Sequence, residues 1–150
     1  MYGRGAAGNA DAVFEDAVSN GRASLHERVP ACPQSIARLR HAATAFAGRH
    51  GASDSQREDI ALAVSEAVSN AVKHAYPGRN RDGTVDLHAR IRDASLKVLV
   101  CDDGEGMQPR STSPGLGLGL AVIGQVTQDV QVESRDPSPG VRVRMTFAIG

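Results

Sequence analysis

The spacing of hydrophobic residues changes about halfway along the chain. In the first half, apolar residues recur every three or four positions, which is typical of amphipathic helices. In the second half, apolar and polar residues alternate, which is typical of half-buried strands. The predicted elements are a strand at 22–30, helices at 33–51 and 52–78, strands at 83–93 and 95–104, a Gly/Pro/Ser-rich loop at 104–117, a helix at 118–129 and a hairpin at 130–149 that turns at 136–140.

This order of elements favours an α+β fold. Helices and strands are clustered and do not alternate strictly, so a two-layer sandwich fits better than a doubly wound parallel sheet. We expect a mostly antiparallel sheet that is covered on one face by three helices. Residues 22–150 form the predicted domain, and residues 1–21 are predicted to be a flexible tail with a short structured fragment near Val13 and Phe14.

Composition and charge restrict the function classes. A chain of 150 residues suits one domain, and its 17 basic and 17 acidic residues cancel, so no bulk field attracts nucleic acid or an anionic membrane. The N-terminus lacks the apolar core of a signal peptide, and no apolar run approaches the roughly 18 residues of a membrane span. Cys32 and Cys101 show no metal or redox spacing. We therefore expect a cytoplasmic protein that binds neither nucleic acid nor membrane.

The longer helix carries two distinct faces, an apolar core stripe and a second, largely polar face. Glu66, Asn70 and His74 follow one another at intervals of four residues on the second face, which sets a carboxylate, an amide oxygen and an imidazole in a line. Such a line can serve a metal-bound polyphosphate, and a plain solvated face is the alternative interpretation. The core stripe comprises Ile60, Val64, Ala67, Val68, Ala71 and Ala75, and the second face comprises Asp59, Ala63, Glu66, Asn70, Lys73 and His74.

The second motif begins where the strand at 95–104 runs into the sequence DDGEG. Asp102 is followed by Gly104 and Gly106, which allow a close approach of the backbone. A buried carboxylate in this position can accept a hydrogen bond from an exocyclic amine such as that of adenine. An Asp-Gly hairpin turn is the alternative. The residues after Gly106 do not resume a strand, which favours the binding interpretation.

The third motif is a run of glycines before the last predicted helix. Gly115, Gly117 and Gly119 lead directly into an apolar helix. A helix N-terminus that follows flexible glycines can bind an anion, because backbone N–H groups point outward and the helix dipole favours negative charge. A loosely capped loop is the alternative, since the spacing matches neither the G-x-x-x-x-G-K-[ST] phosphate loop nor a dinucleotide fingerprint in its usual place.

Taken in this order, the three motifs resemble the ATP-binding domain of the GHKL superfamily, which includes gyrase and the histidine kinases. Within that superfamily, the stretch LAVSEAVSNAVKHAYPG at 62–78 is similar to bacterial anti-sigma factor serine/threonine kinases. The resemblance covers about residues 22–149. It implies the GHKL fold, ATP and Mg²⁺ as cofactors, and protein serine/threonine kinase activity. It also implies two partners, a sigma factor and a STAS-type anti-anti-sigma protein that the kinase phosphorylates.

The resemblance further implies roles for the residues at matching positions. Glu66 is expected to be the general base, Asn70 to hold Mg²⁺, and Asp102 to read the adenine amine. Residues 107–114 are expected to form a short lid. The other nucleotide-binding candidates are Gly104 and Gly106 beside the adenine, Gly115, Gly117, Leu118 and Gly119 around the phosphates, and Lys73, His74 and Arg110 as phosphate contacts.

One pair of positions departs from the family pattern. Val141 and Arg142 stand where the family usually carries threonines after the glycine that begins the last strand. We expect one hydrogen bond to adenine or its bound water, worth about 1 kcal/mol, to be missing. ATP binding should be weakened and still occur.

Two other functions stay open at this point. A non-catalytic module could use ATP only to set its affinity for a partner. A detached histidine-kinase catalytic domain is the second, since LHERVP at 25–30 faintly resembles a phospho-acceptor box, although it falls in a predicted strand. The sequence names no particular partner, and a homodimer is compatible with it.

Overall fold

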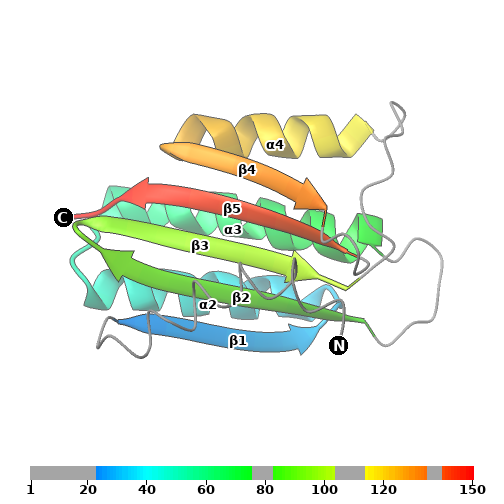
Figure 1. Cartoon of the computed structure of the whole chain (residues 1–150), viewed down its shortest axis with the longest axis horizontal. Helices are drawn as coiled ribbons and strands as arrows, with labels where there is room; N and C mark the ends of the chain where they lie inside the picture. The colour runs from blue at the N-terminus through cyan, green and yellow to red at the C-terminus, as the bar shows by residue number, and fades with distance from the viewer. Residues whose placement is uncertain (1–22, 76–82, 104–113, 135–139) are drawn as a thin grey trace, which may run out of the picture.

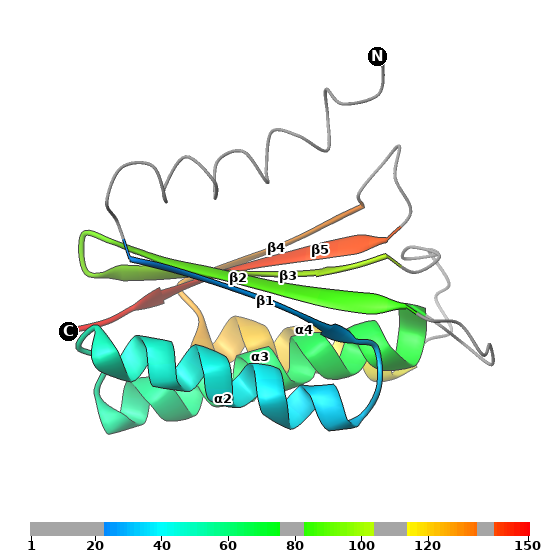
Figure 2. The same ribbon diagram turned by 90° about the horizontal axis from the view of Figure 1, so that it is seen from below.

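The computed structural model describes residues 23–75, 83–103, 114–134 and 140–150, which form two layers (Figures 1 and 2). One layer is a five-stranded antiparallel sheet with the strand order β1-β2-β3-β5-β4. The other consists of three helices on one face of that sheet, which confirms the predicted α+β sandwich. The elements are β1 (Ser24–Pro30), α2 (Gln34–Arg49), α3 (Asp54–Ala75), β2 (Thr84–Arg92), β3 (Ser95–Asp102), α4 (Pro114–Val126), β4 (Asp129–Ser134) and β5 (Val141–Ala148).

The main hydrophobic core lies between the sheet and the helices. Alternate residues of each central strand face the helices, because successive side chains of a strand point to opposite faces. On β2, Val85, Leu87 and Ala89 are fully buried. Burial of a side chain the size of valine or leucine contributes about 1.5–3 kcal/mol. The helix α3 adds the predicted stripe, of which Ile60, Val64, Ala67, Val68 and Ala71 are all buried.

Local sequence signals set the ends of the first two helices. Ser53 and Gln56 cap α3 reciprocally: the Gln56 N–H donates to Ser53 Oγ at 3.1 Å, and the Ser53 N–H donates to Gln56 Oε1 at 2.9 Å. Gly51, with a φ of +96°, ends α2, and the Ala52 N–H donates to the Ala47 carbonyl at 3.0 Å. A serine before a helix and a glycine after one are common boundary signals in sequences.

The last helix begins earlier than the sequence predicts. A helix at 118–129 was expected, whereas α4 spans Pro114–Val126, so Gly115 and Gly117 lie inside the helix and not in the preceding loop. Proline suits the first helical position because its φ is already helical and its missing N–H would lack a partner there. The predicted loop at 104–117 is therefore wrong for its last four residues.

Other predictions fall outside the described residues. These are the tail at 1–21, most of the lid at 107–114 and most of the turn at 136–140. Among the described helices, none combines the length and the apolar character that a bilayer crossing needs.

Candidate active site

The polar face of α3 lies against α4. Gly119 belongs to α4, and a Cβ placed on it would be 2.9 Å from Asn70 Nδ2 and 3.1 Å from Glu66 Oε2. The absence of a side chain at this position therefore allows the helix backbone to approach both polar groups. This contact brings together the first and third motifs, which are far apart in the sequence.

The second face of α3 is not a uniformly solvated surface. Glu66 and Asn70 are half-buried and Lys73 is exposed, but Ala63 is fully buried. The assignment of Ala63 to a separate polar face is therefore wrong, because α4 packs along this side of α3 and covers part of it. A half-buried carboxylate and amide beneath a second helix are better placed to hold a ligand than to face bulk water.

Asp102 ends β3 on the side of the sheet that carries the helices. It follows Val98 and Val100 on that side, and only 5% of its surface is exposed. The Val141 N–H donates to its Oδ1 at 3.3 Å, so the beginning of β5 helps to hold the carboxylate in place. Asp102 thus lies on the same side of the sheet as α3, which a nucleotide site shared by the two motifs requires. Its contact with adenine stays a prediction.

The two residues that replace the family threonines face opposite sides of the sheet. Val141 packs partly buried against the core on the helix side. Arg142 lies on the other side, where it is 6% exposed and its Nη1 is 3.7 Å from Glu133 Oε2. Only the change at position 141 therefore affects the side of the sheet that Asp102 faces.

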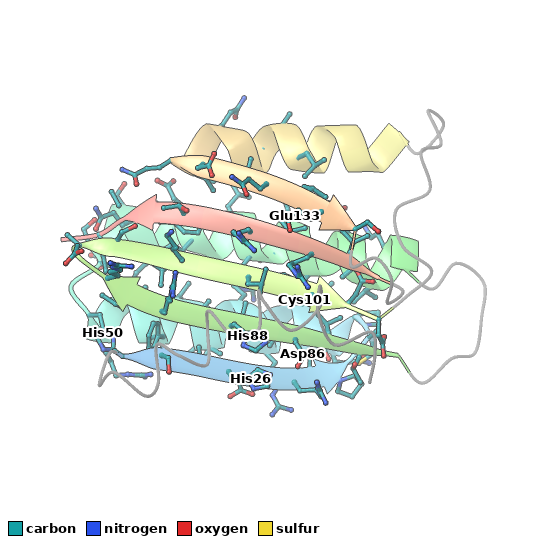
Figure 3. All side chains as sticks on the ribbon, in the orientation of Figure 1. His26, His50, Asp86, His88, Cys101 and Glu133 are labelled. Atoms are coloured by element: carbon teal, nitrogen blue, oxygen red, sulfur yellow. The ribbon has the colours of Figure 1, made fainter. Side chains whose placement is uncertain are left out.

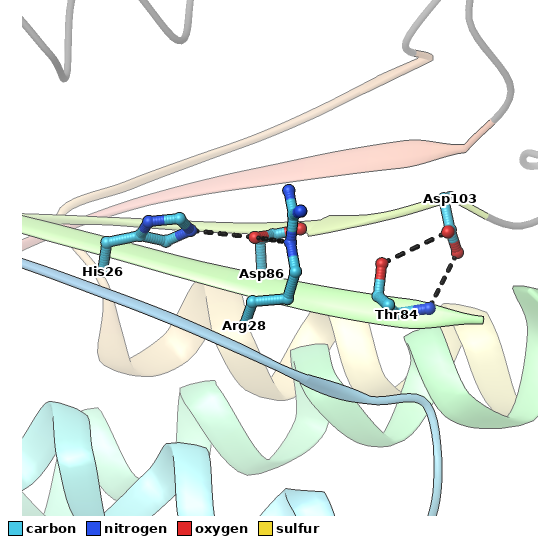
Figure 4. A network of polar contacts seen from close by, with 5 residues as sticks. All are labelled: His26, Arg28, Thr84, Asp86 and Asp103. Carbon is cyan, nitrogen blue, oxygen red and sulfur yellow. Dashed lines mark hydrogen bonds and ion pairs between the residues drawn. The ribbon is translucent and has the colours of Figure 1, made fainter. Parts of the chain in front are cut away.

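A contact that the sequence analysis missed closes this end of the sheet (Figure 4). Asp103 Oδ1 accepts a hydrogen bond from the Thr84 N–H at 3.0 Å, and its Oδ2 accepts one from Thr84 Oγ1 at 3.2 Å. Because Thr84 begins β2 and Asp103 directly follows β3, this carboxylate ties the two strands together beside Asp102. The two consecutive acids in DDG are a sequence signal for this contact. Neighbouring residues of an extended chain point in different directions, so Asp103 must have a different environment from Asp102.

A second polar cluster joins β1 to β2 on the opposite side of the sheet (Figures 3 and 4). Asp86 Oδ1 lies 2.8 Å from His26 Nε2 and 2.8 Å from Arg28 Nε, and the His26 ring stacks on His88 with centroids 4.1 Å apart. Burial raises the pKa of Asp86, but hydrogen bonds and charge from His26 and Arg28 outweigh that effect and hold the pKa below its ordinary value.

This cluster is better explained as structural than as a metal centre. Ligand atoms of His26, Asp86 and His88 lie within 4.8 Å of one another. However, Arg28 already donates to the same carboxylate oxygen, and two parallel stacked rings do not aim their in-plane lone pairs at one point. The cluster also shows that His26 lies on a strand, as predicted, and not on a dimerising helix of the kind that carries the acceptor of histidine kinases.

The remaining candidates cannot be assigned contacts. Gly104, Gly106 and Arg110 lie outside the described residues, and the side chain of His74 is not described. Gly115, Gly117 and Leu118 lie in the N-terminal part of α4. The residues that the structure brings together are therefore Glu66, Asn70 and Gly119, with Asp102 on the same side of the sheet.

The chain is similar to known proteins over most of its length. The sequence profile of the family described as histidine kinase-like ATPase domain matches residues 29–147. The serine-protein kinase RsbW of Staphylococcus aureus is 31% identical over 137 residues, a match that covers 81% of this chain and 84% of the relative.

Solved structures agree in fold. The crystal structure of the RsbU and RsbW domains of a Mycobacterium tuberculosis protein gives a TM-score of 0.67 at 23% identity, covering 85% of this chain and 32% of the other. The histidine kinase domain of a blue-light activated kinase from Erythrobacter litoralis gives 0.54 at 25% identity, covering 81% and 62%. This chain thus corresponds to about a third of the first polypeptide and less than two thirds of the second. The profile match and the kinase relative confirm the family that the motifs predict, and the chain belongs to the family of histidine kinase-like ATPase domains.

Proposed function

We propose that the chain is an ATP-dependent protein serine kinase that acts as an anti-sigma factor. The observation that carries the proposal is the close approach of Gly119 to Glu66 and Asn70, because it brings residues of two separate motifs next to each other. The 31% identity to a serine-protein kinase over most of both chains supports the same activity.

The described residues fit a metal-bound nucleotide. Asn70 offers an amide oxygen, which is a hard ligand of the kind that Mg²⁺ accepts. Asp102 offers a buried acceptor for an exocyclic amine, and the beginning of α4 favours negatively charged phosphates. Because Gly119 has no side chain, the backbone of α4 can lie close to the side chains of Glu66 and Asn70 on α3. When bound, Mg²⁺ would neutralise charge on the phosphate oxygens.

Glu66 is the proposed general base. It accepts the proton of a serine hydroxyl on the protein substrate while the serine oxygen forms a bond to the γ-phosphorus. The bond between that phosphorus and the bridging oxygen breaks, and ADP leaves. Glu66 lies one helical turn from Asn70, so base and metal ligand are held by the same rigid element.

The partners and the location follow the same family resemblance. The proposed phosphate acceptor is a serine of a STAS-type anti-anti-sigma protein, and the proposed inhibited partner is a sigma factor. We propose a cytoplasmic location because both partners act there. All proposed nucleotide contacts lie within this chain, so nucleotide binding and phosphotransfer can be measured separately.

The test is phosphotransfer from labelled ATP and Mg²⁺ to a STAS-type antagonist encoded nearby, with Glu66→Gln as the variant. The substitution keeps side-chain size and removes the base, so transfer in a single turnover should fall by about 10²-fold or more. The equilibrium affinity for ATP should be unchanged, or slightly higher because repulsion with the triphosphate is relieved.

Glu58→Gln is the matched control, since Glu58 is an exposed acid near the beginning of the same helix and should leave both quantities unchanged. Absence of serine phosphorylation by the wild-type protein, with ATP still bound, would support the non-catalytic nucleotide-gated module. Full transfer by Glu66→Gln would place the base elsewhere.

A further inference from the structure

The sheet face opposite the helices, here called the outer face, carries mostly polar side chains around a small apolar centre. Strand pairing sets its side chains in three rows that cross all five strands, and in Figure 3 its labelled side chains project toward the viewer with the helices behind. Within three such rows of described residues, the apolar members are Leu99 and the thiol-bearing Cys101, which are neighbours on this face of the central strand. The rows are Ser24-Arg90-Lys97-Thr146-Asp129, His26-His88-Leu99-Arg144-Gln131 and Arg28-Asp86-Cys101-Arg142-Glu133.

Leu99 and Cys101 are buried more deeply than an open sheet face explains. They are 0% and 3% exposed, and they form a cluster separate from the main core. Every described helix lies on the other side of the sheet, so no helix or strand within the described ranges packs over this pair (Figure 2). Burial of an apolar pair at the centre of a polar face calls for a covering layer.

The rim around this apolar pair is mostly basic. Arg90, Lys97, Arg142 and Arg144 lie around it, and Arg90 and Arg142 are 8% and 6% exposed. The acidic neighbour, Asp86, pairs with Cys101 and is already contacted by His26 and Arg28. Within the described part of the chain, the buried Nε of Arg144 makes no hydrogen bond. Buried guanidinium groups favour carboxylates, and Glu133 supplies one to Arg142 at 3.7 Å. A suitable cover therefore presents apolar side chains at its centre and carboxylates at its edge.

Residues 11–18, with the sequence DAVFEDAV, have this character. The apolar residues Val13, Phe14, Ala17 and Val18 have the spacing that one face of a helix presents. The same stretch contains three acidic residues and no basic residue. We call residues 11–18 the acidic segment.

The acidic segment is also tethered within reach. Ser24 begins β1 in the same row as Lys97, two strands away, which corresponds to about 10 Å across the sheet. Leu99 is two residues further along β3, so it lies about 12 Å from Ser24. Six residue steps separate Val18 from Ser24, and extended chain covers up to about 20 Å over that length.

We propose that the acidic segment packs on the outer face, with Phe14 and Val18 over Leu99 and Cys101 and with its carboxylates beside the basic rim. The residues predicted from composition to form a flexible tail then have a docking place on their own domain. A second copy of the chain could use this face only by displacing the segment, so docking of the segment and face-to-face dimerisation exclude each other.

The test measures how fast a maleimide labels Cys101 in the full chain. In a Cys32→Ser background, Cys101 is the single thiol of the protein. Phe14→Asp with Val18→Asp should speed labelling at least tenfold, because charges replace the apolar contacts. The matched control is Ser19→Asp with Asn20→Asp, which adds the same charge beyond the acidic segment and should leave the rate unchanged. A charge variant, Glu15→Lys with Asp16→Lys, should speed labelling severalfold without touching the apolar residues.

Urea unfolding and light scattering accompany each rate. Faster labelling at unchanged urea stability and unchanged monomer mass supports the proposal. Equal rates in the aspartate variant, the charge variant and the control overturn it. Slow labelling that speeds up on dilution, together with a dimer mass, also overturns it, because a second copy then covers the face.

Discussion

Asp86 and Asp102 are two buried carboxylates at the same end of the sheet that point in opposite directions. Asp86 is 8% exposed on the outer face, and Asp102 is 5% exposed on the helix side. They lie on adjacent strands, where Val85 pairs with Asp102 and Asp86 pairs with Cys101. By burial alone, the two acids are equivalent.

Their surroundings separate them. Asp86 receives His26 and Arg28 from β1, whose hydrogen bonds and charge lower its pKa and match its charge within the fold. Asp102 is held by a backbone N–H of β5 on the side where Glu66, Asn70 and Gly119 meet. Burial alone therefore does not identify a candidate binding acid. The groups that surround the carboxylate, and the elements on its side of the sheet, distinguish the two cases. Four substitutions test the contrast between the two sides of the sheet.

The largest effect is expected at Gly119. Gly119→Ala puts a methyl group 2.9 Å from Asn70 Nδ2, so the ends of Asn70 and Glu66 must move. Alanine is the better helix former, so the free energy of unfolding should be maintained or rise by up to about 1 kcal/mol. Phosphotransfer should nevertheless fall by about 100-fold, since small displacements of catalytic groups have effects of this size.

Gly124→Ala is the control for that experiment. Gly124 lies in the same helix, and apart from the neighbouring backbone of that helix no atom lies within 4 Å of the position that its Cβ would take. It should gain the same stability and keep full activity. Equal activity losses in the two variants, measured beside thermal melts, would mean that α4 as a whole and not the Gly119 contact sustains activity.

The second effect is expected at Asp102. Asp102→Asn replaces an acceptor oxygen with a donor and should weaken ATP binding by at least tenfold, which is about 1.4 kcal/mol. It should also remove discrimination against GTP, because the base-specific contact is lost. Calorimetric titration with both nucleotides measures these quantities, and unchanged ATP affinity would show that Asp102 does not read the base.

The fold was readable from the sequence because each element carries its own signal. The alternation of Val85, Leu87 and Ala89 is one such local signal, and the structure confirms it. The reciprocal cap between Ser53 and Gln56 is equally local, since the two residues are three positions apart. The order of clustered helices and strands then selected the two-layer architecture. The predicted start of α4 is too late because glycines favour loops, whereas Pro114 suits the first helical position.

The site was readable only in part. Glu66, Asn70 and Asp102 could be proposed from their motifs, but the packing of Gly119 against α3 depends on how two helices meet, and no single motif encodes that. The same helix contact explains why Ala63 is buried. The burial of Leu99 does have a signal in the sequence, since the unbroken apolar run VLVC is typical of a strand that is covered on both faces.

The third effect is expected at Asp86 and concerns stability. Asp86→Asn removes the charge that His26 and Arg28 stabilise, and both partners are more than half exposed, so the loss at neutral pH should be about 1 kcal/mol in the free energy of unfolding. ATP affinity should not change, in contrast to Asp102→Asn.

The effect of this substitution should depend on pH in a definite direction. The folded pKa of Asp86 lies below the unfolded value of 3.8, so its charge stabilises the fold above that value, and the stabilisation is lost as the pH falls through the folded pKa. Urea unfolding at pH 7 and in strong acid should therefore show a difference between wild type and variant that shrinks in acid. A difference that stays constant would show that the amide disturbs packing and that charge is not involved.

The smallest effect is expected at the two positions where threonines would stand in the family. Val141 lies on the helix side with its N–H on Asp102, so Val141→Thr adds a hydroxyl on the side of the sheet that the nucleotide would occupy. One added hydrogen bond of about 1 kcal/mol at most should tighten ATP binding threefold to fivefold. Arg142→Thr is the matched substitution on the outer face; it removes the ion pair with Glu133 and should lower stability while ATP affinity stays the same. Calorimetric titration with ATP measures the affinities of both variants and of the wild type. If Arg142→Thr tightens ATP binding and Val141→Thr does not, the nucleotide lies on the outer face, and the assignment of the two sides of the sheet must be exchanged.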